Sequence, residues 1–416
     1  MERIIVPSKV KGEVKAPASK SMTQRAIAAA LLAHGQSTIT NPSYCDDCLA
    51  AMNIAVGLGA KVEPDKDKMK ITGSSVLKEK KLNCGESGLA IRMFSPVAAL
   101  YKTELTITGT GSLKKRPMSM IEDALKQFGI KCESENGFIP LIIKGPLKGG
   151  ACEIDGSSSS QLLTGLLMAL PVAFNDSVVK VSNLKSKPYI DMTMQVLERF
   201  GIKVQNDNYN QFIIPGKQTF KPCNFEVESD WSGGAFLLVA GAINGDIIVN
   251  GLHTDSRQSD KAILSALDKA GAKMSITGNS IEIRKSTLKA FEFDATESPD
   301  LFPPLASLAA YCKGTSGIKG VARLIHKESD RAAALAEEFG KLNIKVEISG
   351  DYMLITGGEV HGTHVLSHDD HRIAMAVAIA GLGASGKVFI KDSQCVSKSY
   401  PGFFDDLRKI GASVYE

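Results

Sequence analysis

The 416-residue sequence is poor in aromatic side chains, and its charges nearly balance. Phe, Trp and Tyr make up 6% of the residues and Trp231 is the single tryptophan, so a base-stacking platform for nucleic acid is not expected. The 49 Lys and Arg residues against 45 Asp and Glu leave a formal charge of +4, which is too small to indicate a nucleic-acid binder. This balance still allows a local basic site for a small anion.

Long apolar runs and a disulfide framework are also missing. No uninterrupted apolar run approaches the roughly 18 residues of a membrane span, and the amino-terminal stretch lacks the apolar core of a secretory signal. The eight cysteines are scattered singly except for Cys45 and Cys48 in a CDDC motif. This motif is typical of a redox centre or half a zinc site, but no second pair stands near it. We therefore expect a soluble cytoplasmic protein, with 44% hydrophobic residues to form two or three domains.

One helical pattern recurs six times along the chain, at intervals of roughly 70 residues. In each copy apolar residues fall at helical spacing, a Gly or Asn ends the helix, and a β-branched run begins. The residues predicted to end these helices are Gly59, Gly129, Gly201, Gly271, Asn343 and Gly411. A fixed period of this length is typical of a structural repeat.

A second type of helix, apolar nearly all round, alternates with the first. A helix without a polar face is buried, and a short strand-like run follows most of the copies. The apolar helices are predicted at 26–35, 90–101, 161–174, 234–245, 302–312 and 372–383. Each repeat therefore predicts a buried helix, a strand, an amphipathic helix and a pair of strands. Six buried helices are too many for one core, so we expect three repeats around each of two cores.

Polar residues stand directly before each apolar helix, as in SKSMTQR (19–25) and SHDDHR (367–372). Helix capping explains the Ser, Thr and Asp residues there. It does not explain Lys20, Arg25 and Arg372, because the positive end of a helix dipole disfavours cations. Cations beside free backbone N–H groups indicate an anion between them, and we interpret these helix starts as parts of a multi-anion site.

Three predicted loops supply further charges: GSLKKRP (111–117), HKESDR (326–331) and QCVSKSYP (394–401). Arg side chains suit bidentate binding of carboxylate or phosphate, and Lys side chains suit point contacts to phosphate or proton transfer. Asp300 and Glu328 are the carboxylates available for acid–base chemistry beside these cations.

Seven motifs together resemble those of the 5-enolpyruvylshikimate-3-phosphate synthase family of enolpyruvyl transferases. They follow the family's order and spacing from the first repeat to the last, although each motif alone is weak. The motifs are SKSMTQR, GSLKKRPM (111–118), DGSSSSQ (155–161), SKPYID (186–191), HKESDR, DDHRIAMA (369–376) and SKSYPGFF (397–404).

The resemblance implies a two-domain inside-out α/β barrel of six βαβαββ repeats, three in each domain. One domain would comprise residues 1–18 and 229–416, and residues 19–228 would form an inserted domain. Hinges are expected near 17–20 and 227–230. We expect a monomer.

The resemblance also implies the reaction, in which the enolpyruvyl group of phosphoenolpyruvate passes to the 5-hydroxyl of shikimate 3-phosphate and phosphate is released. Asp300 is implied as the base on the 5-hydroxyl, and Glu328 with Lys20 as the group handling the proton at the methylene carbon. The implied ligands of shikimate 3-phosphate are Lys20, Ser21, Arg25, Ser159, Ser160, Gln161, Ser186, Tyr189, Asp300 and Lys327. Those of phosphoenolpyruvate are Lys20, Gly88, Arg116, Gln161, Arg331, Arg372 and Lys398.

This inventory suits the chemistry, because the two substrates bring two phosphates and two carboxylates that repel one another. Fixed cations in a water-poor cleft offset this repulsion. The reaction implies no metal and no organic cofactor. The expected partners are these small molecules, with no nucleic acid and no membrane.

Three other interpretations stay open at this point. The sister enzyme that transfers enolpyruvyl to a UDP-amino sugar usually has Cys in the loop equivalent to 111–117, and this loop has none. A metal-binding protein would use the histidines of the HGTH and HDDH segments with the adjacent aspartates; these histidines are His361, His364, His368 and His371. A paralogue that binds the substrates without turning them over is the third.

The paralogue hypothesis depends on departures from the family pattern. Glu86 and Leu89 stand where the family has Asn and Thr, and Arg323 stands in place of an Asn. We expect Glu86 either to cap the second buried helix or to point a carboxylate at the phosphoenolpyruvate pocket, with Leu89 narrowing that pocket. The latter arrangement predicts weaker inhibition by glyphosate, which competes for this pocket in the family.

Overall fold

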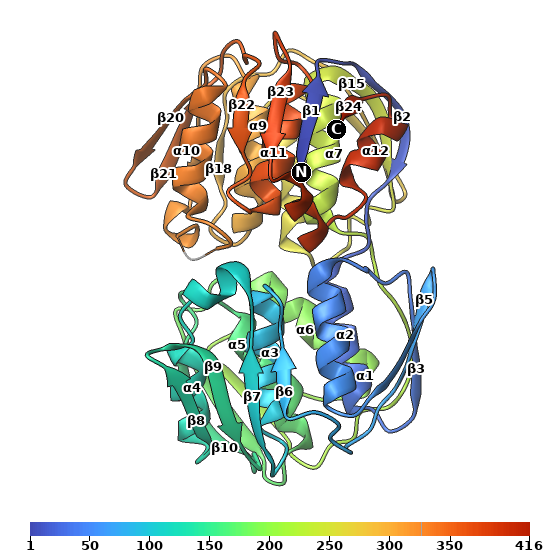
Figure 1. The fold of residues 1–416 in the computed structure, drawn as a ribbon, viewed down its shortest axis with the longest axis vertical. Helices are drawn as coiled ribbons and strands as arrows, with labels where there is room; N and C mark the ends of the chain where they lie inside the picture. The colour runs from blue at the N-terminus through green and yellow to red at the C-terminus, as the bar shows by residue number, and fades with distance from the viewer. Residues whose placement is uncertain (326) are drawn as a thin grey trace. The chain divides into compact units, whose positions relative to one another are not determined.

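The computed structural model describes residues 1–325 and 327–416, so the first residue of the HKESDR motif lies outside the described residues. The chain divides into two compact units (Figure 1). The inserted unit comprises Ala18–Val227. The discontinuous unit comprises Met1–Pro17 together with Glu228–Glu416.

The inserted unit contains three successive groups of helices and strands. The first group consists of α1 (Lys20–Leu32), β3 (Gln36–Thr40), α2 (Asp46–Gly57), β4 (Lys61–Pro64) and β5 (Lys68–Thr72). The second consists of β6 (Lys81–Asn83), α3 (Gly88–Ala98), β7 (Glu104–Thr108), η1 (Gly111–Lys115), α4 (Ser119–Gln127), β8 (Lys131–Glu135) and β9 (Phe138–Lys144). The third consists of β10 (Gly150–Asp155), α5 (Gln161–Ala169), η2 (Leu170–Val172), β11 (Ser177–Ser182), α6 (Lys187–Arg199), β12 (Gln205–Asp207), β13 (Gln211–Ile214) and β14 (Asn224–Glu226).

The discontinuous unit repeats this order of elements. It begins with β1 (Glu2–Val6), β2 (Val10–Lys15), α7 (Trp231–Asn244), β15 (Gly245–Asn250), η3 (Ser259–Ala262), α8 (Ile263–Lys269), β16 (Lys273–Thr277) and β17 (Ser280–Arg284). It continues with β18 (Glu292–Asp294), η4 (Pro299–Leu301), α9 (Phe302–Ala310), β19 (Thr315–Lys319), η5 (Val321–Arg323), α10 (Arg331–Lys341), β20 (Lys345–Ser349) and β21 (Tyr352–Thr356). It ends with β22 (His364–Leu366), α11 (His371–Gly381), β23 (Val388–Lys391), η6 (Ser393–Lys398), α12 (Phe403–Lys409) and β24 (Ser413–Tyr415).

The sheets of both units share one plan. Each described sheet has four strands, with one parallel pair followed by antiparallel pairs, as in the order β14-β3-β5-β4. The two chain ends meet in the sheet β22-β23-β1-β24, where Ile4 lies opposite both Phe389 and Tyr415. This pairing joins the amino-terminal strand to the carboxy-terminal half of the sequence.

The apolar helices form the cores, as the sequence predicted. Residues of α1, α3 and α5 lie in the core of the inserted unit, and residues of α7, α9 and α11 lie in the core of the discontinuous unit. All residues of α11 are buried, and Trp231 at the start of α7 is fully enclosed. Burying one large apolar side chain contributes about 1.5–3 kcal/mol, so these helices are a main source of stability.

The six residues predicted to end the amphipathic helices all adopt left-handed backbone conformations. Their φ angles are +118° (Gly59), +71° (Gly129), +79° (Gly201), +78° (Gly271), +68° (Asn343) and +90° (Gly411). Glycine carries no Cβ to clash there, and a Cβ on Gly59 would come within 2.4 Å of the Val76 carbonyl oxygen. Asn343 replaces glycine because asparagine tolerates this region better than most residues. The predicted helix ends are confirmed.

Two segments that the sequence predicted as loops contain short 3₁₀ helices, η1 and η6. The first is followed by Arg116, whose extended backbone (φ −90°, ψ 135°) suits a residue that precedes a proline. The described cysteines form no disulfide. Among the described helices, none combines the length and apolar character needed to span a bilayer.

Candidate active site

Helix caps account for part of the polar sequence before the buried helices. Ser19 and Ser87 each accept a hydrogen bond from the backbone N–H three residues further on. Asp370 Oδ1 accepts from the N–H of Arg372 at 2.9 Å. The capping interpretation is therefore correct at these positions, and the cations of the first turns need a separate account.

Arg25 lies inside the inserted unit, where only 1% of it is exposed. Its guanidinium donates to Thr193 Oγ1 at 2.9 Å, to the Ser21 carbonyl at 2.9 Å and to the Tyr189 carbonyl at 3.2 Å. Burial lowers the pKa of Arg25 to about 10, since these neutral oxygens offset its desolvation only in part. The structure thus brings two other predicted ligands, Ser21 and Tyr189, to a buried cation that an anion would stabilise.

Lys20 is held by a carboxylate that sequence reasoning missed. Its Nζ lies 2.9 Å from Asp47 Oδ2, and both side chains are largely buried. Asp47 belongs to the CDDC motif, in which Cys45 is the N-cap residue of α2 and the Cys48 thiol donates to the Lys20 carbonyl at 3.6 Å. The motif therefore places an acid beside Lys20. Its position at the start of a helix was the available signal.

Gly88 begins α3 between two guanidinium groups. A Cβ there would lie 2.6 Å from Nη1 of Arg116 and 2.8 Å from Nη1 of Arg92. Nη1 of Arg92 also donates to Gln161 Oε1 at 2.9 Å, and both arginines are buried. A helix N-terminus flanked by two guanidinium groups suits a carboxylate or phosphate. The list of predicted ligands omitted Arg92, although it stands in the ESGLAIR segment.

Glu86 does not cap the second buried helix, which is one of the two roles that the sequence suggested for it. The cap of α3 is Ser87, and the Glu86 carboxylate instead accepts the backbone N–H of Ser112 at 3.0 Å, at the start of η1. Leu89 is buried in the hydrophobic core of the inserted unit. Glu86 is therefore neither a helix cap nor a loose carboxylate, because the η1 backbone binds its charge.

Three predicted phosphate ligands, Ser159, Ser160 and Ser186, lie at helix starts in the inserted unit. Ser160 and Ser186 are the N-cap residues of α5 and α6, and both are buried. Ser159 Oγ accepts the backbone N–H of Gln161 at 3.1 Å. Hydroxyl groups beside exposed helix N–H groups form a suitable phosphate site.

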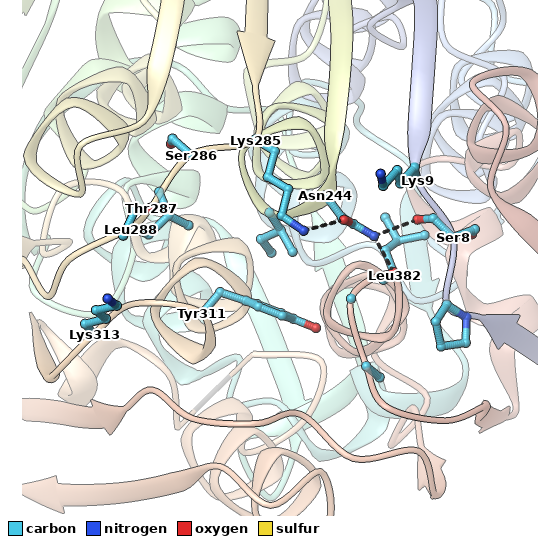
Figure 2. Close-up of a pocket in the computed structure, with 14 residues that line it drawn as sticks. Ser8, Lys9, Asn244, Lys285, Ser286, Thr287, Leu288, Tyr311, Lys313 and Leu382 are labelled. Carbon is cyan, nitrogen blue, oxygen red and sulfur yellow. Dashed lines mark hydrogen bonds between the residues drawn. The ribbon is translucent and has the colours of Figure 1, made fainter.

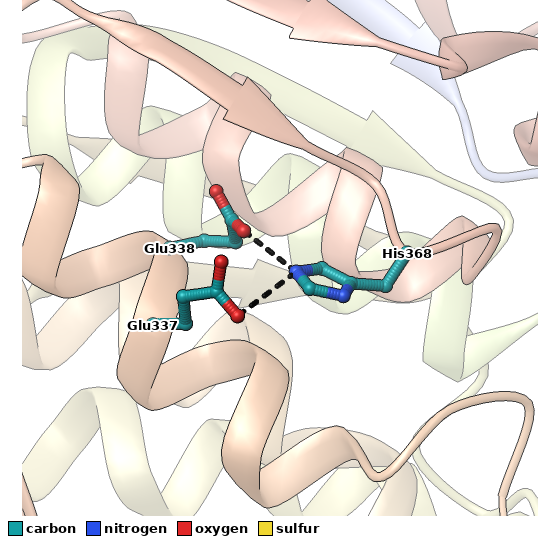
Figure 3. Close-up of side chains that lie close together, drawn as sticks. All are labelled: Glu337, Glu338 and His368. Carbon is teal, nitrogen blue, oxygen red and sulfur yellow. Dashed lines mark hydrogen bonds and ion pairs between the residues drawn. The ribbon is translucent and has the colours of Figure 1, made fainter.

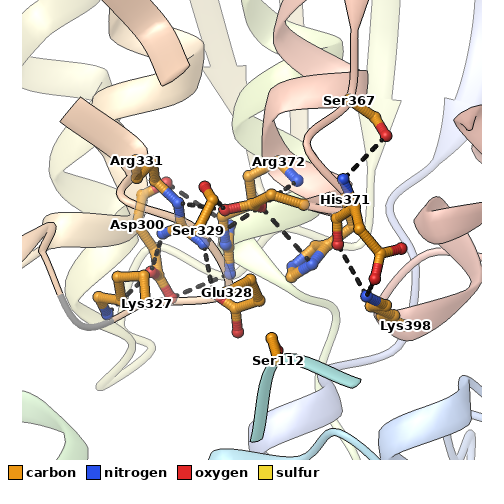
Figure 4. Close-up of polar contacts among 12 residues, drawn as sticks. Ser112, Asp300, Lys327, Glu328, Ser329, Arg331, Ser367, His371, Arg372 and Lys398 are labelled. Atoms are coloured by element: carbon orange, nitrogen blue, oxygen red, sulfur yellow. Dashed lines mark hydrogen bonds and ion pairs between the residues drawn. The ribbon is translucent and has the colours of Figure 1, made fainter. Parts of the chain in front are cut away.

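Arg331 is the centre of a charged cluster in the discontinuous unit (Figure 4). Its guanidinium contacts Asp300 Oδ1 at 3.0 Å, Glu328 Oε2 at 2.6 Å and Asp370 Oδ2 at 3.0 Å. Burial alone would lower the pKa of Arg331, but the three carboxylates raise it above its ordinary value. Arg331 therefore stays charged and fixes the positions of these carboxylates.

Asp300 contacts three cations. Besides Arg331, Lys327 Nζ lies 3.3 Å from its Oδ1 and Arg372 Nη2 lies 3.0 Å from its Oδ2. Burial opposes the charge of Asp300, but Arg372, Lys327 and Arg331 hold its pKa well below the ordinary value. Burial lowers the pKa of Lys327, with Arg331 adding to the effect. Asp300 is thus ionised but weakly basic.

Lys398 joins the same group of residues from η6. Its Nζ donates to the Asp369 carbonyl at 2.7 Å and lies 2.9 Å from Asp369 Oδ2. Asp369 and Asp370 precede α11, so the segment before this helix contacts both Lys398 and Arg331. The structure therefore brings together all the predicted residues of the discontinuous unit: Asp300, Lys327, Glu328, Arg331, Arg372 and Lys398.

Asp260 is a further buried carboxyl that the sequence analysis did not select. Its Oδ1 accepts from Ser259 Oγ at 3.1 Å, and it also bonds to Ser232. Burial, together with the negative charge of Asp300, raises the pKa of Asp260 to about 6, although Arg372 opposes the shift. The SDWSGG segment that holds Ser232 was the available signal.

The four histidines of the metal hypothesis do not form one cluster. The His364 ring stacks on Phe389, and His371 is buried at the start of α11. Within the described part of the chain, the single group that could share an ion combines His368 with Glu337 and Glu338. The hypothesis of a four-histidine site is therefore not supported.

Arg323, which stands where the family has Asn, donates to the Thr296 carbonyl at 3.1 Å.

A pocket of about 480 Å³ lies at the other end of the buried helices of the discontinuous unit (Figure 2). Asn244, Tyr311 and Leu382, at the C-terminal ends of α7, α9 and α11, contribute to its lining. Lys285 Nζ donates to Asn244 Oδ1 at 2.8 Å, and two further lysines line the pocket. Cations there complement the negative ends of the helix dipoles. The pocket contains none of the predicted site residues.

Comparisons with known proteins identify the family of the chain. A sequence model of the family described as EPSP synthase (3-phosphoshikimate 1-carboxyvinyltransferase) matches residues 4–407. A 3-phosphoshikimate 1-carboxyvinyltransferase of Clostridium kluyveri is 40% identical over 416 residues, covering 99% of this chain and 98% of the relative. One of Clostridium perfringens is 39% identical over 414 residues, covering 98% of each.

Solved structures are similar over the whole chain. An EPSP synthase of Acinetobacter baumannii superposes with a TM-score of 0.84 at 28% identity, covering 100% of this chain and 99% of the other. The enolpyruvyl transferase NikO of Streptomyces tendae gives a TM-score of 0.81 at 18% identity, covering 100% of this chain and 98% of the other, and shows a likeness of fold. The mixed α/β fold is therefore that of the EPSP synthase structures.

Proposed function

The chain belongs to the EPSP synthase (3-phosphoshikimate 1-carboxyvinyltransferase) family, and from this premise we propose which of its residues perform the reaction. The enzyme transfers the enolpyruvyl group of phosphoenolpyruvate to the 5-hydroxyl of shikimate 3-phosphate, a step in aromatic biosynthesis. The UDP-amino sugar reaction and the paralogue without turnover are not favoured by the comparisons.

One observation carries the assignment of residues. Asp300, Arg331 and Arg372 come from three distant segments of the sequence, yet their side chains form one hydrogen-bonded cluster. Capping or folding alone does not require two buried arginines and a half-buried carboxylate to converge, and burying charges is costly unless they serve one another or a ligand. A site for small, highly charged substrates accounts for this concentration.

Phosphoenolpyruvate would be bound by cations of both units. Arg331, Arg372 and Lys398 supply three from the discontinuous unit, and Lys20 and Arg116 supply two from the inserted unit. Gly88 would let the substrate approach the backbone at the start of α3, and Gln161 would lie between the two substrates. We add Arg92 to this set, because its Nη1 donates to the Gly88 carbonyl and to Gln161 Oε1.

Shikimate 3-phosphate would be bound mainly by the inserted unit. Its phosphate suits the hydroxyls at the starts of α5 and α6, which are Ser159, Ser160 and Ser186. Arg25, with Ser21 and Tyr189 around it, would pair with a substrate anion. Lys20 also belongs to this set, and from the discontinuous unit Asp300 and Lys327 would contact the reacting hydroxyl.

Asp300 would take the proton of the 5-hydroxyl of shikimate 3-phosphate while the oxygen of that hydroxyl bonds to C2 of phosphoenolpyruvate. Glu328 with Lys20 would give a proton to the methylene carbon and remove one when phosphate leaves. The three cations around Asp300 make it a weak base without substrates. Bound phosphate and carboxylate groups would offset those cations, so the pKa of Asp300 would rise and the base would strengthen when the substrates arrive.

We further propose that the chain forms a two-domain inside-out α/β barrel of six βαβαββ repeats. The domains would be residues 1–18 with 229–416 and residues 19–228, joined by hinges near 17–20 and 227–230. Anionic substrates bound by both domains would draw them together. We propose a cytoplasmic monomer that needs no cofactor, because proton transfer and fixed charges supply the chemistry.

The test is phosphate release from phosphoenolpyruvate in the presence of shikimate 3-phosphate. We expect release only when both substrates are present, and a loss of about 10²-fold or more in kcat for Asp300→Ala and for Glu328→Ala. Asp294→Ala, which changes an exposed aspartate of β18, is the matched control and should keep normal turnover. Normal turnover in either site variant would remove that residue from the mechanism.

Two outcomes would contradict the function itself. Release with UDP-N-acetylglucosamine as the acceptor would assign the sister reaction. Binding of both substrates without release by the wild-type protein would assign a paralogue that only binds them.

A further inference from the structure

Glu338 is a buried carboxylate in the last turns of α10, where it lies beside Glu337 and His368 (Figure 3). Its Oε2 accepts the backbone N–H of Leu366 at 3.0 Å, and its Oε1 accepts from Lys341 Nζ at 2.8 Å. His368 Nε2 lies 2.6 Å from the same Oε1. Since an ionised carboxylate only accepts, Nε2 of His368 carries the hydrogen of this bond. Glu338 therefore contacts three parts of the chain: β22, the segment that follows β22, and its own helix α10.

The partners of Glu338 belong to the segment that presents the anion-site carboxylates. Leu366 ends β22, and α11 begins at His371. Between them, Asp370 contacts Arg331 at 3.0 Å and Asp369 contacts Lys398 at 2.7 and 2.9 Å. We call residues 367–370 the junction. A displacement of the junction would move the partners of two cations assigned to phosphoenolpyruvate.

The backbone of the junction needs a firm hold. His368 and Asp369 both have φ of +53°, a left-handed conformation that residues other than glycine rarely adopt. Such conformations persist where surrounding contacts determine them. The His368 side chain is fixed by Glu338, directly at the first of these two residues.

Both ends of α10 contact the junction. Arg331 at the start of the helix binds Asp370, and Glu338 follows seven residues later on the same helix face, about 10 Å along the axis, beside Glu337, whose Oε2 lies 3.8 Å from His368 Nε2. The first residue of the junction, Ser367, also binds the Lys391 and Asp392 carbonyls. Glu338 adds a contact to His368 inside the junction and to the backbone N–H of Leu366 directly before it.

A metal ion is the competing explanation for the group formed by Glu337, Glu338 and His368. However, Lys341 Nζ lies 2.8 Å from Oε1 of Glu337 and 2.8 Å from Oε1 of Glu338. The ammonium group thus already provides the positive charge between these carboxylates. The geometry favours a clamp made of side chains over a metal centre.

We propose that Glu338 is a positioning residue for the phosphoenolpyruvate half of the site. It fixes the junction, so that Asp370 orients Arg331 and Asp369 orients Lys398. This inference rests on the proposed function for the assignment of those two cations. Its structural part, the fixing of the junction by Glu338, stands independently of the reaction.

Steady-state kinetics separates positioning from general stability. We expect Glu338→Ala to raise KM for phosphoenolpyruvate about 10-fold or more, while KM for shikimate 3-phosphate changes by less than about 2-fold. Glu338→Gln keeps an acceptor for the Leu366 N–H and should recover much of the loss. The control is Glu337→Ala, which removes the neighbouring exposed carboxylate that contacts the same Lys341 and lies 3.8 Å from His368 Nε2 but does not bind the Leu366 N–H, and it should change neither KM. Equal increases in both KM values, or equal effects of the two alanine variants, would overturn the proposal.

Hydrogen exchange gives a readout that does not depend on activity. In the wild-type protein without substrates, the amide of Leu366 should be protected, and Glu338→Gln should weaken this protection less than Glu338→Ala does. Leu366 protection that is unchanged in both variants would overturn the proposal, and if the alanine variant folds poorly, unchanged protection in Glu338→Gln together with a normal KM for phosphoenolpyruvate in that variant would overturn it as well. An inactive wild-type enzyme would contradict the proposed function and leave this test valid. Loss of Leu366 protection from wild-type protein dialysed against a chelator would assign the group to a metal and overturn the clamp.

Discussion

Nε of Arg331 and Oδ2 of Asp370 lie 3.0 Å apart, and neither side chain has any exposure to solvent. The pair joins the first residue of α10 to the cap of α11. Two ions removed from water are stable only while each keeps its partner and its hydrogen bonds. The arrangement of the anion site and the stability of the discontinuous unit therefore depend on the same contact.

Loss of this pair should be costly for folding. We expect Asp370→Ala to lower the free energy of unfolding by about 3–5 kcal/mol, because it leaves the buried guanidinium of Arg331 with less compensation. Asp369→Ala is the control, since its carboxylate is mostly exposed and should contribute under about 1 kcal/mol. Urea denaturation of both variants measures the difference. Equal stabilities would mean that Asp300 and Glu328 suffice to compensate Arg331.

The pH dependence of the reaction should report the change of charge around Asp300. In the free enzyme its pKa lies well below the ordinary 3.8, so Asp300 stays deprotonated at low pH and adds no acid limb to kcat/KM above about pH 4. Anionic substrates offset the neighbouring cations and raise this pKa in the complex. The base is active when deprotonated, so kcat should begin to fall at a higher pH than kcat/KM on the acid side. Coincident acid limbs would contradict tuning by substrate.

The pair formed by Lys20 and Asp47 predicts a role for the CDDC motif in turnover. Asp47→Ala removes the carboxylate that holds Lys20 Nζ at 2.9 Å, and we expect kcat/KM to fall about 10-fold or more because the ammonium group loses its fixed position. Asp46→Ala changes the exposed neighbour in the same helical turn and should have little effect. A normal kcat/KM for Asp47→Ala would show that the substrates alone position Lys20.

The contacts of Glu86 and Leu89 change what is expected from their substitution. Glu86→Ala removes the acceptor for the Ser112 N–H, so η1 should loosen and KM for phosphoenolpyruvate should rise several-fold through Arg116. Leu89→Thr should lower the free energy of unfolding by about 1–3 kcal/mol, since it removes apolar volume and adds a hydroxyl in the core.

Inhibition by glyphosate gives a separate readout for these two positions. Since Glu86 binds the η1 backbone, Glu86→Asn with Leu89→Thr should weaken the fold without a large gain in sensitivity. A double variant that kept its stability and became strongly sensitive would restore the pocket-narrowing hypothesis.

Substrate binding should be visible in solution scattering if the proposed hinges near 17–20 and 227–230 operate. We expect shikimate 3-phosphate with phosphoenolpyruvate to reduce the radius of gyration and to raise the melting temperature by linkage. Arg25→Ala, which removes a proposed ligand, should reduce both effects at the same concentrations. An unchanged radius of gyration at saturation would contradict closure about these hinges.

Much of the fold could be predicted from the sequence because helix ends and buried helices have local sequence signals. The helix ends at Gly59 and Asn343 follow from the left-handed backbone that a C-terminal turn requires. The apolar helices show no polar face, which only a buried position allows. Each signal depends on a few neighbouring residues, so the helices and their ends can be predicted without knowing which elements pack against them.

Side-chain contacts between segments far apart in the sequence could not be predicted in this way. Asp47, Arg92 and Asp260 lie near predicted residues, but their partners are far away in the sequence. The sequence allows Glu86 either to cap its helix or to face the substrate pocket; in the structure Ser87 is the cap, and Glu86 accepts the backbone N–H of Ser112. Sequence position alone does not distinguish an acid that caps its own helix from one that binds another loop.

The buried helices, the helix ends and, through seven motifs in order, the family could be predicted from the sequence alone. Tertiary structure decided which charges meet. Arg331 contacts Asp300, Glu328 and Asp370 at once because α10, the segment before α9 and the segment before α11 come together around it. The physical reason is one of range. Backbone conformation and amphipathic pattern are fixed within a turn or two, whereas pairing of buried charges depends on desolvation and distance, which only the packed chain defines.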